Sequence, residues 1–401
     1  MYGKTRSPEC WRANAALIVL LPLIGVFGAI PLQGSQTSNA HLLENGVGFL
    51  RRGDLSSAEK TFVELLKQKP KSEVAYYWLG VTYLKQQKNA QAEEALLKAT
   101  QLRPDFPEAY DALGILYDGQ GLYAKSDPAF MRALALKPNY ANALYNLGLS
   151  YLRQGRPAEA EVKFKDILRF DGNYAKAYLQ VGLAESNLGN HSEAENWLKN
   201  YLQREPNDGF AYIKLGETYF NLGRYQEAIE SFKQAASHGP DVSHALSQLG
   251  FTYYNVGQYP ESEQALEKAI ALDAKNIDGQ LYLGMVLLDE GKRREALAHF
   301  EDVLAMQPEN SEALYYDGYI YLMEGDLNKA LSQLHSAIRS SHDNAKAYYA
   351  LALAYHHLKR PDKANEALQT FQKLQELQHE ESKKGTMYLY QRRETPRPAI
   401  Q

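Results

Sequence analysis

A unit of 34 residues recurs along this chain of 401 residues, and no insertion or deletion interrupts its register. Its marker is a glycine that usually follows a large apolar residue, as Gly216 follows Leu215. Glycine stands at this step as Gly46, Gly80, Gly114, Gly148, Gly182, Gly216, Gly250, Gly284 and Gly318, and Ala352 occupies the last step. A period of this length and regularity predicts one array of stacked repeats rather than several unrelated globular domains.

Within one period, the apolar residues predict two helices. Leu215 and Tyr219 have the spacing of one helical face, and Ala228 and Phe232 have the spacing of a second one. Glycines follow the first helix and prolines follow the second, which are the residues expected where helices end. Because Gly216 and Ala228 are both small, we expect the two helices to approach each other closely between them. The fold class predicted is therefore all-α.

The positions of these residues resemble the tetratricopeptide repeat. The shared features are a large residue before glycine at the eighth position, tyrosine at the eleventh, alanine at the twentieth and twenty-seventh, phenylalanine or leucine at the twenty-fourth and proline at the thirty-second. The resemblance covers residues 39–378 as ten repeats that start at residues 39, 73, 107, 141, 175, 209, 243, 277, 311 and 345. It implies a right-handed α-α superhelical solenoid of helix-turn-helix repeats. It implies a binding scaffold and says little about the ligand.

The amino-terminal residues 1–38 have the layout of a secretory signal. Lys4, Arg6 and Arg12 precede an apolar run at residues 15–30, which small and polar residues follow. This run is shorter than the roughly 20 residues that a membrane-spanning helix prefers. A cleaved signal peptide, a retained membrane anchor and a buried apolar segment therefore remain as alternatives. The first two place the repeats outside the cytoplasm, either periplasmic or secreted, with attachment to the inner membrane in the case of an anchor.

At the other end, we expect the second helix of the last repeat to extend to about residue 380. Leu368, Phe371 and Leu374 would face the array and cap it. The remaining residues 379–401 contain several basic residues and two prolines, and we expect them to form a flexible basic tail.

No motif in the sequence supports catalysis, a cofactor or a metal site. Gly46-Val47-Gly48 lacks a third glycine and lies in an expected helix, so it is not a nucleotide-binding loop. His356 and His357 are adjacent on an expected helix and point about 100° apart, so they cannot readily share a metal. We therefore expect a protein that is not an enzyme, with no small-molecule substrate. The net charge of −4 also gives no electrostatic reason to bind nucleic acid.

By the resemblance, first helices line a concave groove, with the second, fifth, ninth, twelfth and thirteenth positions most exposed. The candidate partner-binding residues at these positions are Tyr77, Tyr145, Asn187, Glu217, Phe220, Asn221, Phe251, Tyr254, Asn255, Tyr315, Tyr319 and Tyr349. Tyrosine offers a broad contact area at little entropic cost, which suits the binding of peptides. The alternatives are that the rings pack between neighbouring repeats and that the asparagines cap helix ends.

The expected function is a non-enzymatic scaffold that binds an extended peptide or a partner subunit in this groove. The resemblance to envelope proteins of the same class implies a role in envelope assembly, secretion or polysaccharide export. The alternative is a recruiting or regulatory subunit of an enzyme complex such as a glycosyltransferase.

Overall fold

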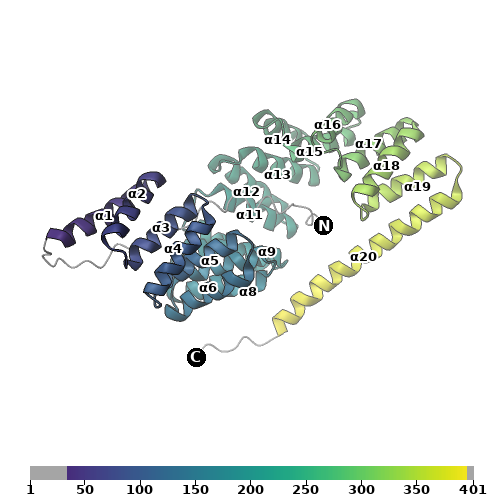
Figure 1. Ribbon diagram of the computed structural model, residues 1–401. Coiled ribbons are helices and arrows are strands. Elements are labelled where there is room, and N and C mark those ends of the chain that lie inside the picture. The colour runs from purple at the N-terminus through teal and green to yellow at the C-terminus, as the bar shows by residue number, and fades with distance from the viewer. Residues whose placement is uncertain (1–33, 395–401) are drawn as a thin grey trace. The chain divides into compact units, whose positions relative to one another are not determined.

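The computed structural model describes residues 34–394, which form helices joined by short turns, with no strand among them. The apolar run at residues 15–30 lies outside the described residues, as do residues 395–401. The helices are α1 (Gly34–Arg51), α2 (Leu55–Gln68), α3 (Glu73–Lys85), α4 (Asn89–Leu102), α5 (Pro107–Gly119), α6 (Tyr123–Leu136), α7 (Ala141–Arg153), α8 (Pro157–Phe170), α9 (Ala175–Asn187), α10 (His191–Leu202), α11 (Gly209–Asn221), α12 (Tyr225–His238), α13 (Val242–Asn255), α14 (Tyr259–Leu272), α15 (Ile277–Asp289), α16 (Arg293–Met306), α17 (Ser311–Glu324), α18 (Leu327–Ser340), α19 (Ala345–His357) and α20 (Pro361–Glu394) (Figure 1). Odd-numbered helices are the first helices of the repeats and even-numbered helices are the second. The predicted all-α array of tandem helix pairs is confirmed.

Contacts divide the chain into two compact parts, which we call the N-terminal body (to Ala177) and the C-terminal body (from Tyr178). In each body the two helices of a repeat pack against each other, and the second helix also packs on the first helix of the next repeat. First helices of neighbouring repeats touch as well, for example α5 with α7 and α13 with α15. Among the described helices, second helices of neighbouring repeats make no comparable contact. The first helices therefore line the inner side of each body.

A left-handed residue ends the first helix of every repeat. Glycines at this position have φ between 72° and 83°, as in Gly223. The second and tenth repeats lack this glycine, yet Gln87 and Lys359 adopt the same conformation at φ 61° and 57°. A side chain in this region is strained, so the tight turn between the paired helices imposes the conformation at these two positions.

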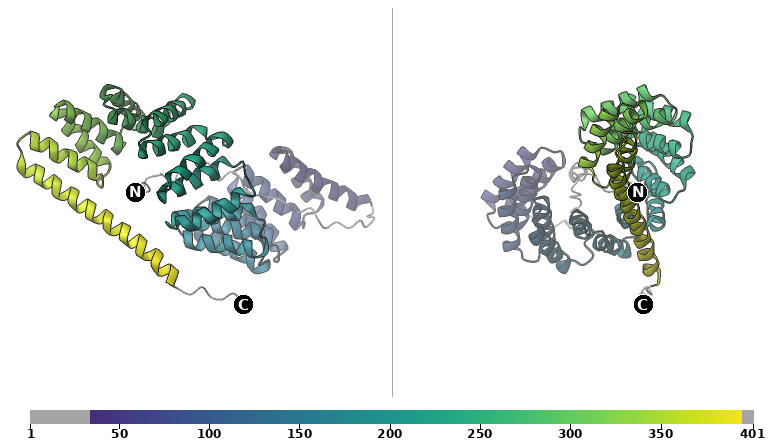
Figure 2. Two further views of the ribbon diagram at one scale, coloured as in Figure 1. Left: turned by 180° about the vertical axis from the view of Figure 1, so that it is seen from behind. Right: turned by 90° about the vertical axis from the view of Figure 1, so that its right-hand side faces the viewer.

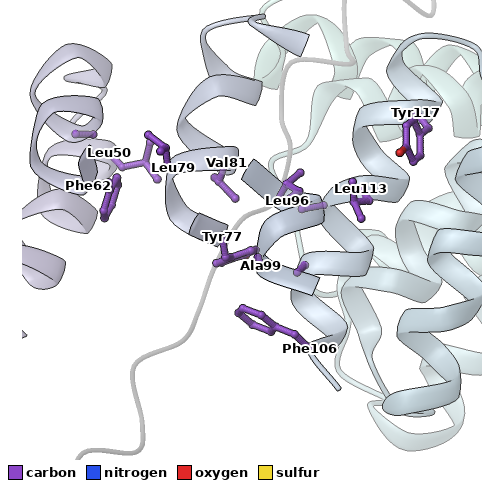
Figure 3. Close-up of a cluster of buried hydrophobic side chains, with 13 residues drawn as sticks. Leu50, Phe62, Tyr77, Leu79, Val81, Leu96, Ala99, Phe106, Leu113 and Tyr117 are labelled. Atoms are coloured by element: carbon purple, nitrogen blue, oxygen red, sulfur yellow. The ribbon is translucent and has the colours of Figure 1, made fainter. Parts of the chain in front are cut away.

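The marker glycines make room for a large side chain of the second helix. A Cβ atom added to Gly216 would lie 2.6 Å from Cε1 of Phe232. The residue sixteen positions after each marker glycine is fully buried, as Phe62, Leu96, Phe130, Phe164, Leu198, Phe232, Leu266, Phe300 and Leu334. Figure 3 shows two of them, Phe62 and Leu96, within the core of the N-terminal body. Each repeat thus buries one large side chain directly over a helix backbone.

A cross-repeat ion pair recurs every 68 residues, which the 34-residue marker does not reveal. The base precedes the second helix of an even-numbered repeat, and the acid lies on the second helix of the preceding repeat. The pairs are Lys88–Glu59 at 2.9 Å, Arg156–Asp127 at 3.2 Å, Arg224–Glu195 at 2.7 Å and Lys292–Glu263 at 3.2 Å. In three of them the base also lies over a tyrosine ring of its own repeat (Tyr83, Tyr151, Tyr219). Odd and even repeats are therefore not equivalent.

Two expectations about single helices differ from the structure. Because of Pro128, we expected the second helix of the third repeat to start late or to kink. Helix α6 begins at Tyr123, the same repeat position at which α4 begins, so it does not start late. The last helix, α20, continues to Glu394 and extends well past α19 (Figure 2). Residues 381–394 are therefore helical, whereas we expected them to belong to a flexible tail. No described helix is both long and apolar enough to cross a membrane.

Candidate functional site

The inner side of the C-terminal body carries four neighbouring aromatic rings, Phe220 on α11, Phe251 and Tyr254 on α13 and Tyr282 on α15, which we call the aromatic row. Phe251 lies at its centre, with ring centroids 5.5 Å from Phe220, 4.4 Å from Tyr282 and 6.4 Å from Tyr254. Phe251 is buried, whereas the other three rings are half-buried. The row therefore presents three partly exposed rings on a packed base across three consecutive repeats.

Tyr254 is fixed at the edge of this row by a polar contact to the next repeat. Its hydroxyl donates a hydrogen bond to Oδ2 of Asp289 on α15, at 2.7 Å. Tyr259 flanks the ring on the other side, with centroids 5.9 Å apart. Because both ends of the side chain are held, the ring loses little conformational freedom when a ligand packs on it.

The polar candidates in this region differ in the contacts that their side chains make. Asn187, Asn221 and Asn255 are exposed at the ends of α9, α11 and α13. Nδ2 of Asn255 donates to the carbonyl oxygen of Phe251 at 2.7 Å, so this amide is already bonded to its own helix, as the capping alternative predicts. Glu217 forms an ion pair with Lys214 at 2.8 Å, which offsets its negative charge on the inner side.

Three further candidates lie on the last repeats. The rings of Tyr315 and Tyr319 on α17 stack with centroids 5.9 Å apart, and burial raises the pKa of Tyr315. Tyr349 on α19 is 46% exposed and lies beside Phe371 of α20, at 5.3 Å. This group offers a second aromatic surface, of which Tyr349 is the most exposed ring.

In the N-terminal body, the two predicted tyrosines have different surroundings. Tyr77 is only 4% exposed, with the ring of Phe106 at 5.1 Å, and Figure 3 shows both within the core. Tyr145 is half-buried, with Phe164 at 5.5 Å and Tyr174 at 6.0 Å. For Tyr77, as for Phe251, the alternative of packing between repeats describes the structure, and these two rings do not belong to an exposed surface.

A buried carboxylate lies on the inner side between these tyrosines. Asp111 of α5 is 3% exposed, and Nδ2 of Asn146 donates to its two oxygens at 3.0 and 3.3 Å. Burial raises the pKa of Asp111 to about 7, against the opposing effect of the Asn146 hydrogen bond. On the same helix, Asp118 is also buried and pairs with Arg153 of α7. Helix α5 thus places two buried acids on the inner side of the N-terminal body, of which only Asp118 has a basic partner.

Sequence reasoning missed Tyr282, Asp289 and Asp111. Tyr282 stands at the sixth position, which we did not assign to the groove, although the aromatic residue recurs there as Tyr316 in the following repeat. Asp289 stands at the thirteenth position, where the three preceding repeats have asparagine, and this change from amide to acid was the signal in the sequence. The signal for Asp111 was that it is the one acidic residue at the fifth position, where the other repeats have apolar or hydroxyl side chains. Among the side chains that the structure describes, no three His, Cys, Asp or Glu gather to hold a metal ion.

Three family models match the sequence. The model described as the C-terminal domain of cilia and flagella-associated protein 70 matches residues 168–387, more than half of the chain. Two models described as tetratricopeptide repeat match residues 49–116 and 112–176. No curated protein matches the sequence.

Solved structures with a similar arrangement of helices include three that differ in their coverage. The chain is similar to a structure of Pseudomonas aeruginosa PilF, with 19% identity over 52% of this chain and 95% of that one, at a TM-score of 0.46. It is similar to the APC/C hetero-tetramer Cut9-Hcn1, with 14% identity over 85% and 94% at a TM-score of 0.48. It is also similar to YrrB, described as a repeat protein with an unusual peptide-binding site, with 24% identity over 49% and 97% at a TM-score of 0.38.

Proposed function

We propose that this chain, which belongs to the tetratricopeptide repeat family, is a non-enzymatic scaffold that binds an extended peptide segment of a partner protein along the inner side of its first helices. Residues 168–387 belong to the family of the C-terminal domain of cilia and flagella-associated protein 70. Membership implies a scaffold and does not identify the partner, so the proposal is argued from the side chains on the inner side.

The observation that carries the proposal is the aromatic row. Phe220, Tyr254 and Tyr282 are half-buried on three successive repeats, and their rings pack on the buried Phe251. Partly exposed rings held in place by packing provide apolar contact area at a low entropic cost. A peptide that crosses successive first helices would cover one such ring in each repeat.

Hydrogen-bonding groups beside the row suit the main chain of such a peptide. The carboxamides of Asn187 and Asn221 are exposed at the thirteenth position of their repeats, and Asn221 directly follows Phe220 of the row. Each carboxamide offers both a donor and an acceptor, which matches the alternating polar groups of an extended backbone. Contacts of this kind position a chain without selecting its sequence, so the rings would supply the preference for side chains.

A photo-crosslinking experiment tests the binding surface. With a benzophenone amino acid at Asn221, we expect one discrete protein adduct in intact cells, and no such adduct with the same group at Glu230, which is exposed on the second helix α12. Adding Tyr254→Ala should reduce the Asn221 adduct about tenfold, because truncating an aromatic ring in a binding surface costs about 1–2 kcal/mol. Tyr254→Phe should reduce it less, since the ring is kept while the bond to Asp289 is lost. Equal adducts at both positions, or an adduct unaffected by Tyr254→Ala, would contradict the proposal.

We further propose that the scaffold works outside the cytoplasm, in envelope assembly, secretion or polysaccharide export. The support is the order of basic, apolar and polar regions in residues 1–38. Protease added to cells with a permeabilised outer membrane should digest the repeats, whereas deletion of residues 1–38 should protect them. Protection of the full-length protein until the inner membrane is broken would place it in the cytoplasm instead. Recovery of an enzyme as the crosslinked partner, with activity that requires the repeats, would favour the recruiting subunit over the plain scaffold.

A further inference from the structure

We infer that α5 in the N-terminal body carries a subsite for a basic side chain, lysine or arginine, of the bound segment, with Asp111 as its anion. The inference rests on the proposed function for the existence of a bound peptide. It goes beyond that function because it assigns a side-chain preference to one repeat. Three observations support it: the charges on the inner side, the partners of Asp111, and the rings around it.

The fifth, ninth and twelfth positions of the first helices carry acids but no lysine or arginine, whereas bases stand at the second and thirteenth positions of other first helices, as Arg51, Lys85, Arg153, Lys176 and Lys346. At the fifth, ninth and twelfth positions of the ten repeats, Asp111, Asp118 and Glu217 are the only residues that carry a charge, leaving aside His356. Two of these three acids lie on α5, seven residues apart and therefore on the same face of that helix. The segment that lies along this side meets negative charge concentrated at α5, which complements a basic residue.

Asp111 differs from the other two acids in having no basic partner. Asp118 pairs with Arg153, and Glu217 pairs with Lys214. Asp111 accepts its hydrogen bonds from the single Nδ2 of Asn146. The charged group that affects its pKa is the acid Glu108, which raises that pKa further. The bases on the adjoining turns, Arg103 and Lys137, lie near Glu108 instead, at 4.0 and 3.9 Å.

An ionised carboxylate that is 3% exposed and served by one donor is costly unless a cation joins it. An ammonium or guanidinium group brings the positive charge and the additional donors that Asp111 lacks. Other residues could have filled this position more cheaply, since leucine occupies it as Leu43, Leu179 and Leu281. The carboxylate at α5 is therefore a feature that packing alone does not require.

Tyrosine rings surround the position. The negative charge of Asp111 acts on the phenols of Tyr140 and Tyr174, and Tyr145 lies beside Tyr174 with ring centroids 6.0 Å apart. These three rings are half-buried, so part of each ring reaches the surface near the buried carboxylate. The faces of aromatic rings attract cations, and the apolar stem of a long side chain packs well on such rings. A long unbranched side chain with a positive end group would therefore gain contacts with the rings as well as with the carboxylate. Lysine and arginine have this shape.

The test uses a random dodecapeptide library displayed on phage and selected against the full-length protein. We expect the selected peptides to be enriched in lysine or arginine at one position. A synthetic peptide with the selected sequence should bind Asp111→Asn at least about tenfold more weakly than the wild type, the loss expected for a charge-assisted hydrogen bond. Glu94→Gln removes the same charge from the exposed side of α4 and should leave the affinity unchanged.

A second arm separates the subsite from a general effect of charge. Replacing the selected basic residue of the peptide by norleucine should weaken binding to the wild type about tenfold and should not weaken binding to Asp111→Asn further. Asp111→Leu, with the side chain that other repeats use at this position, should show the same loss if Asp111→Asn folds poorly. Unchanged helicity and melting temperature show that the variants are folded.

The outcomes distinguish this inference from the proposed function. Peptides that bind without a basic preference, or that bind Asp111→Asn as tightly as the wild type, would overturn the subsite and leave the scaffold standing. A failure to select any peptide, with the wild type folded, would overturn both.

Discussion

Truncating Phe232 to alanine is expected to lower the free energy of unfolding of the C-terminal body by about 3–5 kcal/mol. The ring is 1% exposed and lies directly over the backbone of α11 at Gly216, where an added Cβ would approach it to 2.6 Å. Alanine would leave a cavity between α11 and α12 that neither helix can close, because both also pack on their other neighbours. Phe232 thus holds together the two helices of its own repeat.

The matched control is Phe232→Leu. Leucine occupies the equivalent position in five other repeats, as Leu96, Leu198, Leu266, Leu334 and Leu368. We expect this variant to lose less than about 1.5 kcal/mol, the usual range for swaps between large apolar side chains. Urea denaturation followed by circular dichroism gives both values. Hydrogen exchange should show the loss of protection concentrated in α11, α12 and their neighbours, since each repeat contacts only adjacent ones. Similar losses for the two variants, or a loss under 1 kcal/mol for alanine, would contradict the assigned role.

The 34-residue period predicts the helix pairs because the residues that recur in it meet structural requirements within each single repeat. A glycine is required wherever a large ring or leucine lies over the first helix, as Phe232 lies over Gly216. A left-handed residue is required wherever the chain turns between the paired helices, even where the residue is Gln87. Such local demands recur in every repeat and are therefore visible in the sequence.

The 34-residue period does not specify the contacts between repeats, and these contacts determine which candidate binding residues are exposed. Tyr77 and Tyr145 share the fifth position, but Tyr77 is the more deeply buried. Phe251 shares the ninth position with Tyr319 and is buried by Tyr282, a residue outside the consensus. The exposure of a ring depends on the side chains that neighbouring repeats place beside it. For this reason the sequence predicts which positions carry rings but not which of these rings are exposed.

A second departure from the consensus is a buried carboxylate, which we expect to have a large effect on stability. Asp317 on α17 stands where seven other repeats have leucine, as Leu79, Leu113, Leu147, Leu215, Leu249, Leu283 and Leu351. It is 2% exposed, with one oxygen accepting a hydrogen bond from Nε2 of Gln333 and the other, Oδ1, without a partner among the described residues. Burial raises its pKa to about 6, and the Gln333 bond only partly opposes this effect.

The sign of the effect on stability follows from this shift. Well below pH 4 the carboxyl is protonated in both the folded and the unfolded chain, and it does not oppose folding by its charge. As pH rises from about 4 to 6, the unfolded chain releases the proton while the folded chain retains it, so the stability contributed by this group falls. Above the folded-state pKa the loss is complete and amounts to roughly 3 kcal/mol for a shift of about two units.

Asp317→Leu is therefore expected to raise the free energy of unfolding at pH 7.5, and its advantage over the wild type should be about 2.5 kcal/mol larger at pH 7.5 than at pH 4. Asp317→Asn keeps the shape and the acceptor for Gln333 but removes the titration, so it should show the same pH dependence relative to the wild type with a smaller overall gain. Urea denaturation of the three proteins between pH 4 and pH 7.5 measures these differences, in which the other carboxyl groups cancel. Parallel stability curves for all three would mean that Asp317 is as readily ionised in the folded chain as in the unfolded one, and its burial in α17 would then cost the protein nothing.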